Sequence, residues 1–235
     1  MKYGRKTFLD RKEQEEIIGK ILQNRLKIHG KIPITGRSAE NYAMQLFPDM
    51  TPIVMKRYIG RSHYLDMACG INHMYPESLL CSVKGSKKKD GLDIHSLPDS
   101  SDSSVRYYKG DAYKMAFEDN AYDCITVNNF MYFWERHPSK LLKLYKELYR
   151  VCKSGGEVRI FPVFFGNYAC DNVELYDFLN KRFKIQCLRP TKNYSKESPV
   201  YVEDDTIKVG EEGHGTHERR NHNELMSHVI ILTKI

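Results

Sequence analysis

The sequence predicts an α/β fold in which helices cover a mostly parallel sheet. From residue 63 onward, short segments rich in β-branched and aromatic residues alternate with segments of helical periodicity. This alternation is typical of parallel strands joined by crossover helices. No internal repeat is visible in the chain, so a solenoid or a propeller is not expected.

Each expected strand is a short apolar run bounded by turn-forming residues. The strands are expected at residues 63–67, 91–94, 105–108, 122–127, 157–165, 183–188 and 228–235. Helices are expected at residues 76–83, 139–152 and 171–182, with Ser139 as an N-cap. We assign Gly155 and Gly156 to the end of the second of these helices and the entry to the next strand. The connection from residue 95 to 104 is short, so a loop or a single helical turn is expected there.

The first sixty residues have a different pattern, because apolar residues recur at helical spacing and no strand-like run appears. A long helix is expected before Gly30, followed by short helices at residues 38–46 and 51–58. We therefore expect residues 1–60 to be a helical N-terminal arm packed on a main domain at residues 61–235. The main domain contains a long polar insertion at about residues 189–227.

The composition fits one folded domain. The chain has 235 residues, of which 41% are hydrophobic, and a net charge of +7 that permits an anionic partner without requiring one. Its longest aliphatic run, residues 229–232, is far shorter than the ~20 residues of a membrane span. The charged N-terminus lacks the apolar region of a secretory signal, and the cysteines are scattered. We expect a soluble, cytoplasmic protein with free thiols and no membrane partner.

Four segments occur in an order and spacing that resemble a known family. They are YLDMACGIN at residues 64–72, GLDIHS at 91–96, YKGDAYKMAFEDNAYD at 108–123 and ELYRVCKSGG at 147–156. Together they resemble the class I S-adenosylmethionine (SAM)-dependent methyltransferases, and among these the broad type 11 group. The resemblance covers about residues 55–165 and weakly includes the last strand.

The resemblance implies both a fold and an activity. The fold would be a three-layer, Rossmann-like sandwich with a seven-stranded sheet whose last strand is antiparallel. The cofactor would be SAM, and the chain would transfer its methyl group to an acceptor, for which a small molecule is our first interpretation. A protein or RNA acceptor stays open.

Three candidate residues have a physical reason to contact the cofactor. Gly70 lacks a Cβ, which allows the backbone of the turn after the first strand to approach an adenosyl group. Asp93 ends the second strand, where a carboxylate can accept hydrogen bonds from both ribose hydroxyls. Ile94 would provide an apolar face to the adenine. Asp93 could also be an ordinary loop acid before Ser96.

The resemblance implies further contacts at neighbouring positions. Asp111 would accept from the adenine amino group, and the backbone N–H of Ala112 would contact a ring nitrogen. Asp66 and Asn128 would lie near the methionine part, and Ala68 is one of the small residues of the turn. Simpler interpretations remain, since Asp66 could cap the turn and Asp111 could form a turn after a glycine.

This chain departs from the family in its glycine motif, where the three small positions are Ala68, Gly70 and Asn72. Alanine is a mild change and asparagine tolerates a left-handed conformation, so the turn remains feasible. A Gly-x-Gly-x-x-Gly motif is absent, which argues against a nicotinamide-dependent dehydrogenase. The altered motif also leaves an alternative open, namely a non-catalytic SAM-binding or Rossmann-like partner subunit.

The acceptor side is less readable. Aromatic residues gather at residues 130–134 and at Tyr168, as either an acceptor wall or packing under the arm. Three histidines, His214, His217 and His222, lie in the long insertion, with acceptor recognition, a general base or a solvated loop as interpretations. Their spacing matches no common metal site, so no metal is assigned. No Asn-Pro-Pro-Tyr signature follows residue 127, which disfavours the amino-methylating enzymes that use it. No catalytic residue is assigned.

Overall fold

The computed structural model describes residues 37–70, 72, 77–85, 87, 89–94, 99–100, 102–128, 138–161, 173–190, 201–203 and 229–235. These residues belong to one compact unit, residues 36–235. Three predicted features lie outside the described residues: the long helix before Gly30, the aromatic segment 130–134 with Tyr168, and the histidine-containing segment 214–222. The division into an arm at residues 1–60 and a main domain stays a prediction.

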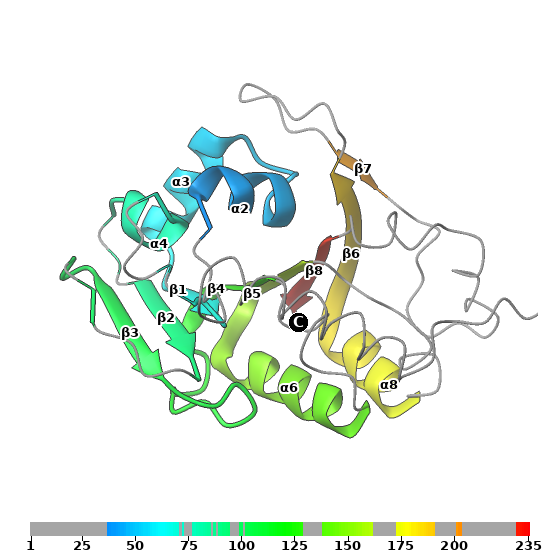
Figure 1. Ribbon diagram of the computed structural model, residues 1–235. Coiled ribbons are helices and arrows are strands. Elements are labelled where there is room, and N and C mark those ends of the chain that lie inside the picture. The colour runs from blue at the N-terminus through cyan, green and yellow to red at the C-terminus, as the bar shows by residue number, and fades with distance from the viewer. Residues whose placement is uncertain are drawn as a thin grey trace, which may run out of the picture. The chain divides into compact units, whose positions relative to one another are not determined.

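A single mixed sheet forms the centre of the described structure (Figure 1). Its strand order is β3-β2-β1-β4-β5-β8-β6-β7. Strands β1 to β5 pair in parallel, whereas β8 lies antiparallel between β5 and β6. The strands are β1 (Tyr64–Met67), β2 (Lys89–Asp93), β3 (Val105–Lys109), β4 (Tyr122–Asn128), β5 (Cys152–Phe161), β6 (Phe183–Pro190), β7 (Tyr201–Glu203) and β8 (Val229–Lys234).

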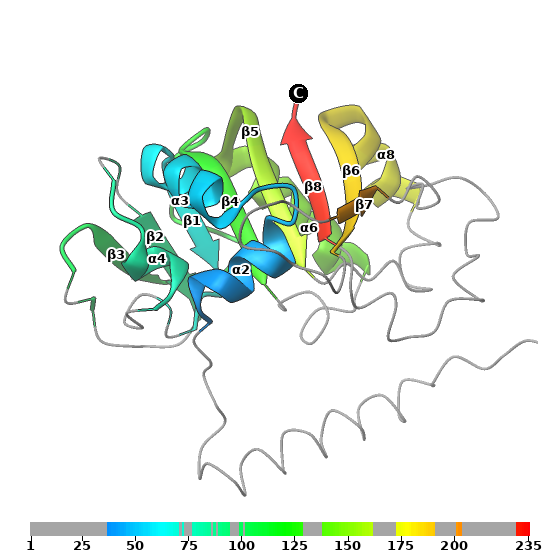
Figure 2. The same ribbon diagram turned by 90° about the horizontal axis from the view of Figure 1, so that it is seen from above.

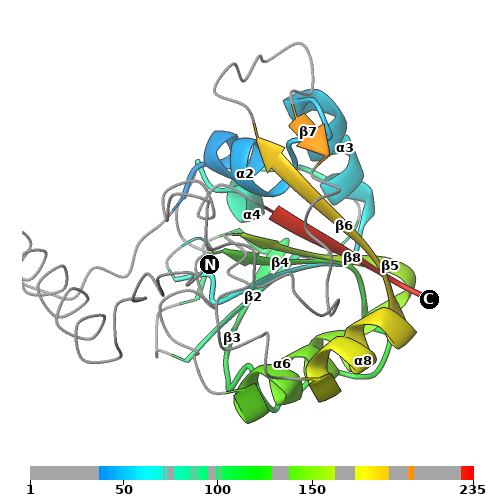
Figure 3. The ribbon, with the colours of Figure 1, turned by 90° about the vertical axis from the view of Figure 1, so that its right-hand side faces the viewer.

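The predicted fold class is confirmed. Seven of these strands form the expected mostly parallel sheet with an antiparallel last strand, and the short β7 extends it at the β6 edge. Helices cover both faces, which completes three layers (Figure 3). One face carries α2 (Ala39–Leu46), α3 (Pro52–Arg61) and α4 (Leu79–Ser82); the other carries α6 (Pro138–Val151) and α8 (Val173–Arg182).

Hydroxyl side chains determine where the helices of the first face begin. The side chain of Ser38 accepts a hydrogen bond from the backbone N–H of Asn41 and caps α2. Thr51 caps α3 in the same way, with Pro52 in the first turn, where a missing N–H costs nothing. Ser78 caps α4. The short helices predicted at residues 38–46 and 51–58 therefore exist, and the second extends to Arg61.

One local prediction is wrong. Helix α6 begins at Pro138 rather than after a cap at Ser139, and it ends at Val151, before the two glycines. Gly155 and Gly156 lie inside β5, where the register with β4 shifts between Tyr122 and Cys124. Gly155 has φ +72°, and a Cβ on Gly156 would lie 3.0 Å from the carbonyl oxygen of Asp123. The glycine pair therefore serves a bulge in a strand rather than a helix end.

The sheet is buried on both faces by two clusters of apolar side chains. Successive residues of β1 alternate between them, because Tyr64 packs under α2 and α3 while Leu65 and Met67 pack towards α6. Tyr122 and Cys124 of β4 are both buried. Within β4, the polar Thr126 is also fully buried, which requires a hydrogen-bonding partner inside the protein.

Candidate cofactor-binding site

Four neighbouring parallel strands bring most of the predicted site residues to one edge of the sheet. Asp66 lies near the end of β1, Asp93 and Asn128 end β2 and β4, and Asp111 follows β3. In the order β3-β2-β1-β4 these ends are adjacent. Ligands of open parallel sheets bind outside the carboxyl ends of the strands, so this edge is the candidate site.

The turn after β1 approaches the end of β2 through its backbone. The N–H of Cys69 donates to the carbonyl oxygen of Leu92 at 3.1 Å, and the N–H of Gly70 donates to the Asp93 carboxylate at 2.9 Å. Gly70 has φ +54°, a conformation that glycine adopts at little cost. Ala68 has φ +56°, which is strained for a residue with a Cβ. The two small residues are therefore needed where the backbone turns.

Asp93 is a buried carboxylate at the mouth of this turn, with 8% of its surface exposed. Its backbone carbonyl accepts a hydrogen bond from Gly110 N–H at 2.9 Å, which ties the end of β2 to the loop after β3. The next residue, Ile94, is 68% exposed, although it is large and apolar. An oriented carboxylate beside an exposed apolar side chain suits a ligand with a polyol and a planar ring.

Asp111 and Ala112 lie on the loop after β3, but their roles differ. Asp111 is exposed, and its carboxylate accepts a hydrogen bond from the backbone N–H of Tyr113 at 2.9 Å. This is the behaviour of a turn-forming aspartate. Ala112 is half-buried and packs against the core. The turn interpretation of Asp111 is thus observed, and its contact with adenine stays a prediction.

Asp66 is the centre of a buried polar cluster, with 1% of its surface exposed. Its carboxylate accepts hydrogen bonds from the Tyr42 hydroxyl, from the Asn72 amide nitrogen at 2.8 Å and from the Thr126 hydroxyl at 3.0 Å. Burial raises the pKa of Asp66 from its ordinary value of 3.8 to about 6, although the hydrogen bonds from Asn72, Tyr42 and Thr126 act in the opposite direction.

Helix α2 crosses the same edge of the sheet, as Figure 2 shows. Besides Tyr42, it contributes Gln45, whose side-chain oxygen accepts a hydrogen bond from the Asn128 amide at 3.1 Å. Its end is held by the buried Arg159 of β5, which donates to the carbonyl oxygen of Leu46 at 3.0 Å and to Asp49. These contacts place α2 over the ends of β1 and β4.

The sequence did not single out Tyr42, Gln45, Thr126 or Arg159. Thr126 and Arg159 each have a signal of their own, since each is a polar residue between two apolar residues of a strand. Elsewhere in the described chain, no group of three or more His, Cys, Asp or Glu side chains could hold a metal ion. No helix in the described ranges is long and apolar enough to cross a membrane.

Comparison with known families agrees with this geometry. Residues 65–160 match a family model described as a methyltransferase domain. The matched segment runs from β1 to β5, and so it includes the four strand ends of the candidate site. Residues 65–160 therefore resemble a methyltransferase domain. The family resemblance that the sequence predicts is confirmed.

Individual proteins resemble this chain less closely. Sterol 24-C-methyltransferase of Neurospora crassa is 32% identical over 89 residues, which are 37% of this chain and 22% of that protein. The chain thus spans about a fifth of that relative's length. A Burkholderia thailandensis 1,6-didemethyltoxoflavin-N1-methyltransferase, solved with 1,6-didemethyltoxoflavin and S-adenosylhomocysteine, has a TM-score of 0.50 at 10% identity, over 97% of this chain and 92% of that one.

A SAM-dependent methyltransferase of Methanosarcina mazei has a TM-score of 0.40 at 14% identity, over 79% of this chain and 97% of that chain. At the identity of the Burkholderia structure, the likeness shows the shared fold alone.

Proposed function

We propose that this chain transfers the methyl group of SAM to a small-molecule acceptor. The observation that carries the proposal is the junction between β1 and β2, where the Gly70 N–H donates to the buried Asp93 carboxylate beside the exposed Ile94. This junction lies inside the segment that resembles a methyltransferase domain, residues 65–160. The same junction holds Gly70, Asp93 and Ile94, three of the residues that the sequence assigns to the adenosyl group.

The residues at this edge fit the cofactor. The hydrogen bond from Gly70 orients the Asp93 carboxylate, which is then ready to accept from the two ribose hydroxyls. The exposed side chain of Ile94 would cover one face of the adenine, and the loop of Asp111 and Ala112 would contact the adenine edge. Ala68 and Asn128, at the ends of β1 and β4, are proposed to lie on the methionine side.

SAM supplies a methyl group bound to a positively charged sulfur. A nucleophile takes the methyl group by attack opposite the sulfur, and the sulfur leaves as a neutral thioether. The protein's part is to hold the adenosyl group in place, align the acceptor and exclude water. Because an acceptor needs a base only when it must lose a proton, no general base is assigned. Alignment by the strand ends is the contribution that this site can make.

A small molecule is proposed as the acceptor because two of the similar proteins are named for small molecules. One is named for a sterol, and the structure of the other was solved with 1,6-didemethyltoxoflavin bound.

Cofactor binding is tested by calorimetry with S-adenosylhomocysteine. Asp93→Ala should weaken binding at least tenfold, roughly the loss of one or two charge-assisted hydrogen bonds. The control is Asp177→Ala, which removes an exposed aspartate on α8 and should leave affinity unchanged. Equal affinity of wild type and Asp93→Ala would remove Asp93 from the site, and no binding by the wild type would contradict the proposed function.

The acceptor is tested with a cell extract and a donor that carries a radiolabelled methyl group. The label should enter the small-molecule fraction and should be absent with Asp93→Ala. Label in the protein or RNA fraction would overturn the acceptor class. No label in any fraction, despite tight binding of S-adenosylhomocysteine, would favour the non-catalytic alternative.

A further inference from the structure

The carboxylate of Asp66 accepts hydrogen bonds from three groups of the protein itself. Oδ1 accepts from the hydroxyls of Tyr42 at 2.8 Å and Thr126 at 3.0 Å, and Oδ2 accepts from Tyr42 and the Asn72 amide, each at 2.8 Å. Three donors thus direct one hydrogen each at the carboxylate, and the Tyr42 hydrogen is shared between its two oxygens. With 1% of its surface exposed, Asp66 is also separated from solvent.

The donors around Asp66 can be assigned without ambiguity. The Arg37 backbone N–H donates to Asn72 Oδ1 at 2.7 Å, so the amide nitrogen of Asn72 must face the other way. That nitrogen has two hydrogens, and its two acceptors are Asp66 and the Tyr42 hydroxyl. Thr126 has one hydrogen, which goes to Asp66, and so Tyr64 donates to Thr126 at 2.5 Å.

The same cluster also fixes the turn after β1, which contains Gly70, at Asn72. Asn72 closes the turn through its backbone N–H, which donates to the carbonyl oxygen of Cys69 at 3.0 Å. Its own carbonyl oxygen accepts from the Ser78 hydroxyl at 2.5 Å. Gly70, which contacts Asp93, lies between these fixed points. Asn72 occupies a position where the family has a small residue, and here its side chain joins the turn to α2.

We propose that Asp66, Tyr42 and Asn72 are positioning residues, which hold the turn of Gly70 for the adenosyl group without contacting the cofactor. This inference rests on the proposed function, and it replaces the expectation that Asp66 lies against the methionine part. Helix α2 thereby becomes part of the proposed cofactor site, because its Tyr42 supplies the hydrogen bond that joins the cluster to this helix.

Two ligands distinguish a positioning role from a direct contact. S-adenosylhomocysteine has an adenosyl and an amino-acid part, whereas 5′-methylthioadenosine has the same adenosyl part and no amino acid. If Asp66 positions the turn, Asp66→Asn should weaken both ligands by the same factor, about three- to tenfold, the scale of one or two disturbed hydrogen bonds. If Asp66 contacts the methionine part, only S-adenosylhomocysteine should be weakened, which would overturn the proposal.

Tyr42→Phe is the second variant, because it removes one hydroxyl, keeps the ring and avoids an altered charge. It should also weaken both ligands equally, by about threefold. The matched control is Tyr145→Phe, a buried tyrosine of the opposite cluster, which should leave both affinities unchanged even where it lowers stability. Wild-type affinities in both Asp66→Asn and Tyr42→Phe would overturn the proposal. If the wild type binds neither ligand, the proposed function itself fails.

Discussion

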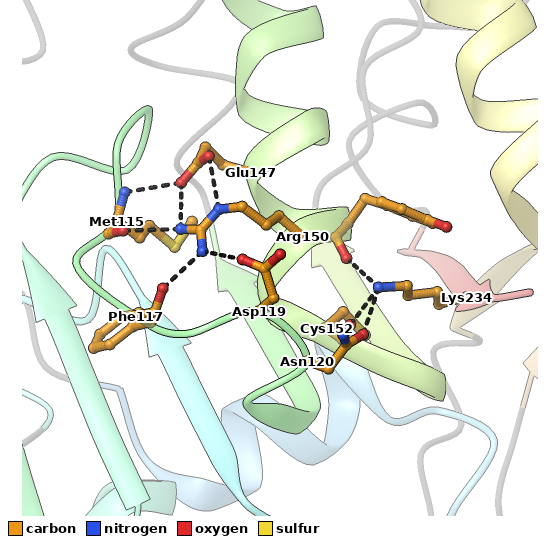
Figure 4. Close-up of polar contacts among 9 residues, drawn as sticks. Met115, Phe117, Asp119, Asn120, Glu147, Arg150, Cys152 and Lys234 are labelled. Carbon is orange, nitrogen blue, oxygen red and sulfur yellow. Dashed lines mark hydrogen bonds and ion pairs between the residues drawn. The ribbon is translucent and has the colours of Figure 1, made fainter.

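Two polar clusters lie near opposite ends of β4, one buried around Asp66 and one partly exposed around Arg150. Near the carboxyl end, uncharged donors surround the Asp66 carboxylate. At the amino end, the guanidinium of Arg150 in α6 reaches the loop before β4 (Figure 4). Its Nε and Nη2 donate to Glu147, Nη1 to Asp119 and the carbonyl oxygen of Phe117, and Nη2 also to that of Met115.

The two clusters differ in how their charge is compensated. Among the described residues, uncharged side chains donate to Asp66, and burial raises its pKa to about 6. Arg150 pairs with two carboxylates, and its side chain is 29% exposed. Burial acts to raise the pKa of Glu147, but the hydrogen bonds from Arg150 and the Met115 N–H outweigh it, and the pKa is lowered. The Asp66 carboxylate is therefore costly to ionise, whereas the ionised form of the Glu147 carboxylate is stabilised.

The Arg150 cluster stabilises the fold, whereas the Asp66 cluster lies at the candidate site. The Glu147–Arg150 pair belongs to the sequence motif at residues 147–156, yet it braces a loop from the side of α6. Lys234 of β8 donates to Asn120 and to the carbonyl oxygens of Tyr149 and Cys152, each at 2.8 Å (Figure 4). We call the contacts of Arg150 and Lys234 together the brace. The motif at residues 147–156 thus contributes to the stability of the fold, whereas the Asp66 cluster lies beside the turn that contains Gly70.

The largest expected effect is on stability, when the site cluster loses its central acceptor. Asp66→Ala leaves the Tyr42 hydroxyl, the Asn72 amide and the Thr126 hydroxyl without that acceptor in a buried space. At about 1 kcal/mol or more for each, the free energy of unfolding should fall by about 3 kcal/mol. Urea unfolding measures this. Asp177→Ala, which breaks an exposed pair with Lys181, should change stability by less than about 0.5 kcal/mol.

Sequence patterns predicted the strands because these depend on local order, and the family motifs located Gly70 after β1 and Asp93 at the end of β2. β-rich runs, helix caps and a glycine after a strand are each readable within a few residues. The Asp66 cluster was not predicted, because Tyr42 is 24 residues from Asp66 and Thr126 is 60 residues from it. Only the folded sheet brings them together. The glycine pair at residues 155–156 misled for a related reason, since the neighbouring β4 decides that it forms a bulge.

The second prediction concerns pH. The contributions of Asp66 and Glu147 to stability should change in opposite directions as pH rises. The pKa of Asp66 is raised on folding, so the folded protein binds its proton more readily than the unfolded chain. The stability that this provides is present at low pH and is lost as pH rises through about 6. The difference in unfolding free energy between wild type and Asp66→Asn should therefore be about 2 kcal/mol more favourable to the wild type at pH 4 than at pH 7.

Glu147 provides the internal comparison, because its pKa is lowered on folding. Its stabilisation is present above the unfolded pKa and is lost as pH falls, so the difference between wild type and Glu147→Gln should shrink towards acidic pH. Urea unfolding at a series of pH values measures both differences. A flat difference for Asp66→Asn would mean that its carboxyl is not the titrating group inferred here.

The smallest expected effect is that of Arg150→Lys, which tests whether the brace is separate from the site. A lysine donates from a single nitrogen and cannot serve Glu147, Asp119 and both loop carbonyls together. Because the loop is partly exposed, water can replace some of these bonds, and stability should fall by about 1 kcal/mol. The loop's other end stays tied to β2 by the Gly110 N–H. S-adenosylhomocysteine affinity should therefore change by less than about twofold, as calorimetry can measure; a loss as large as that of Asp93→Ala would make the brace part of the site.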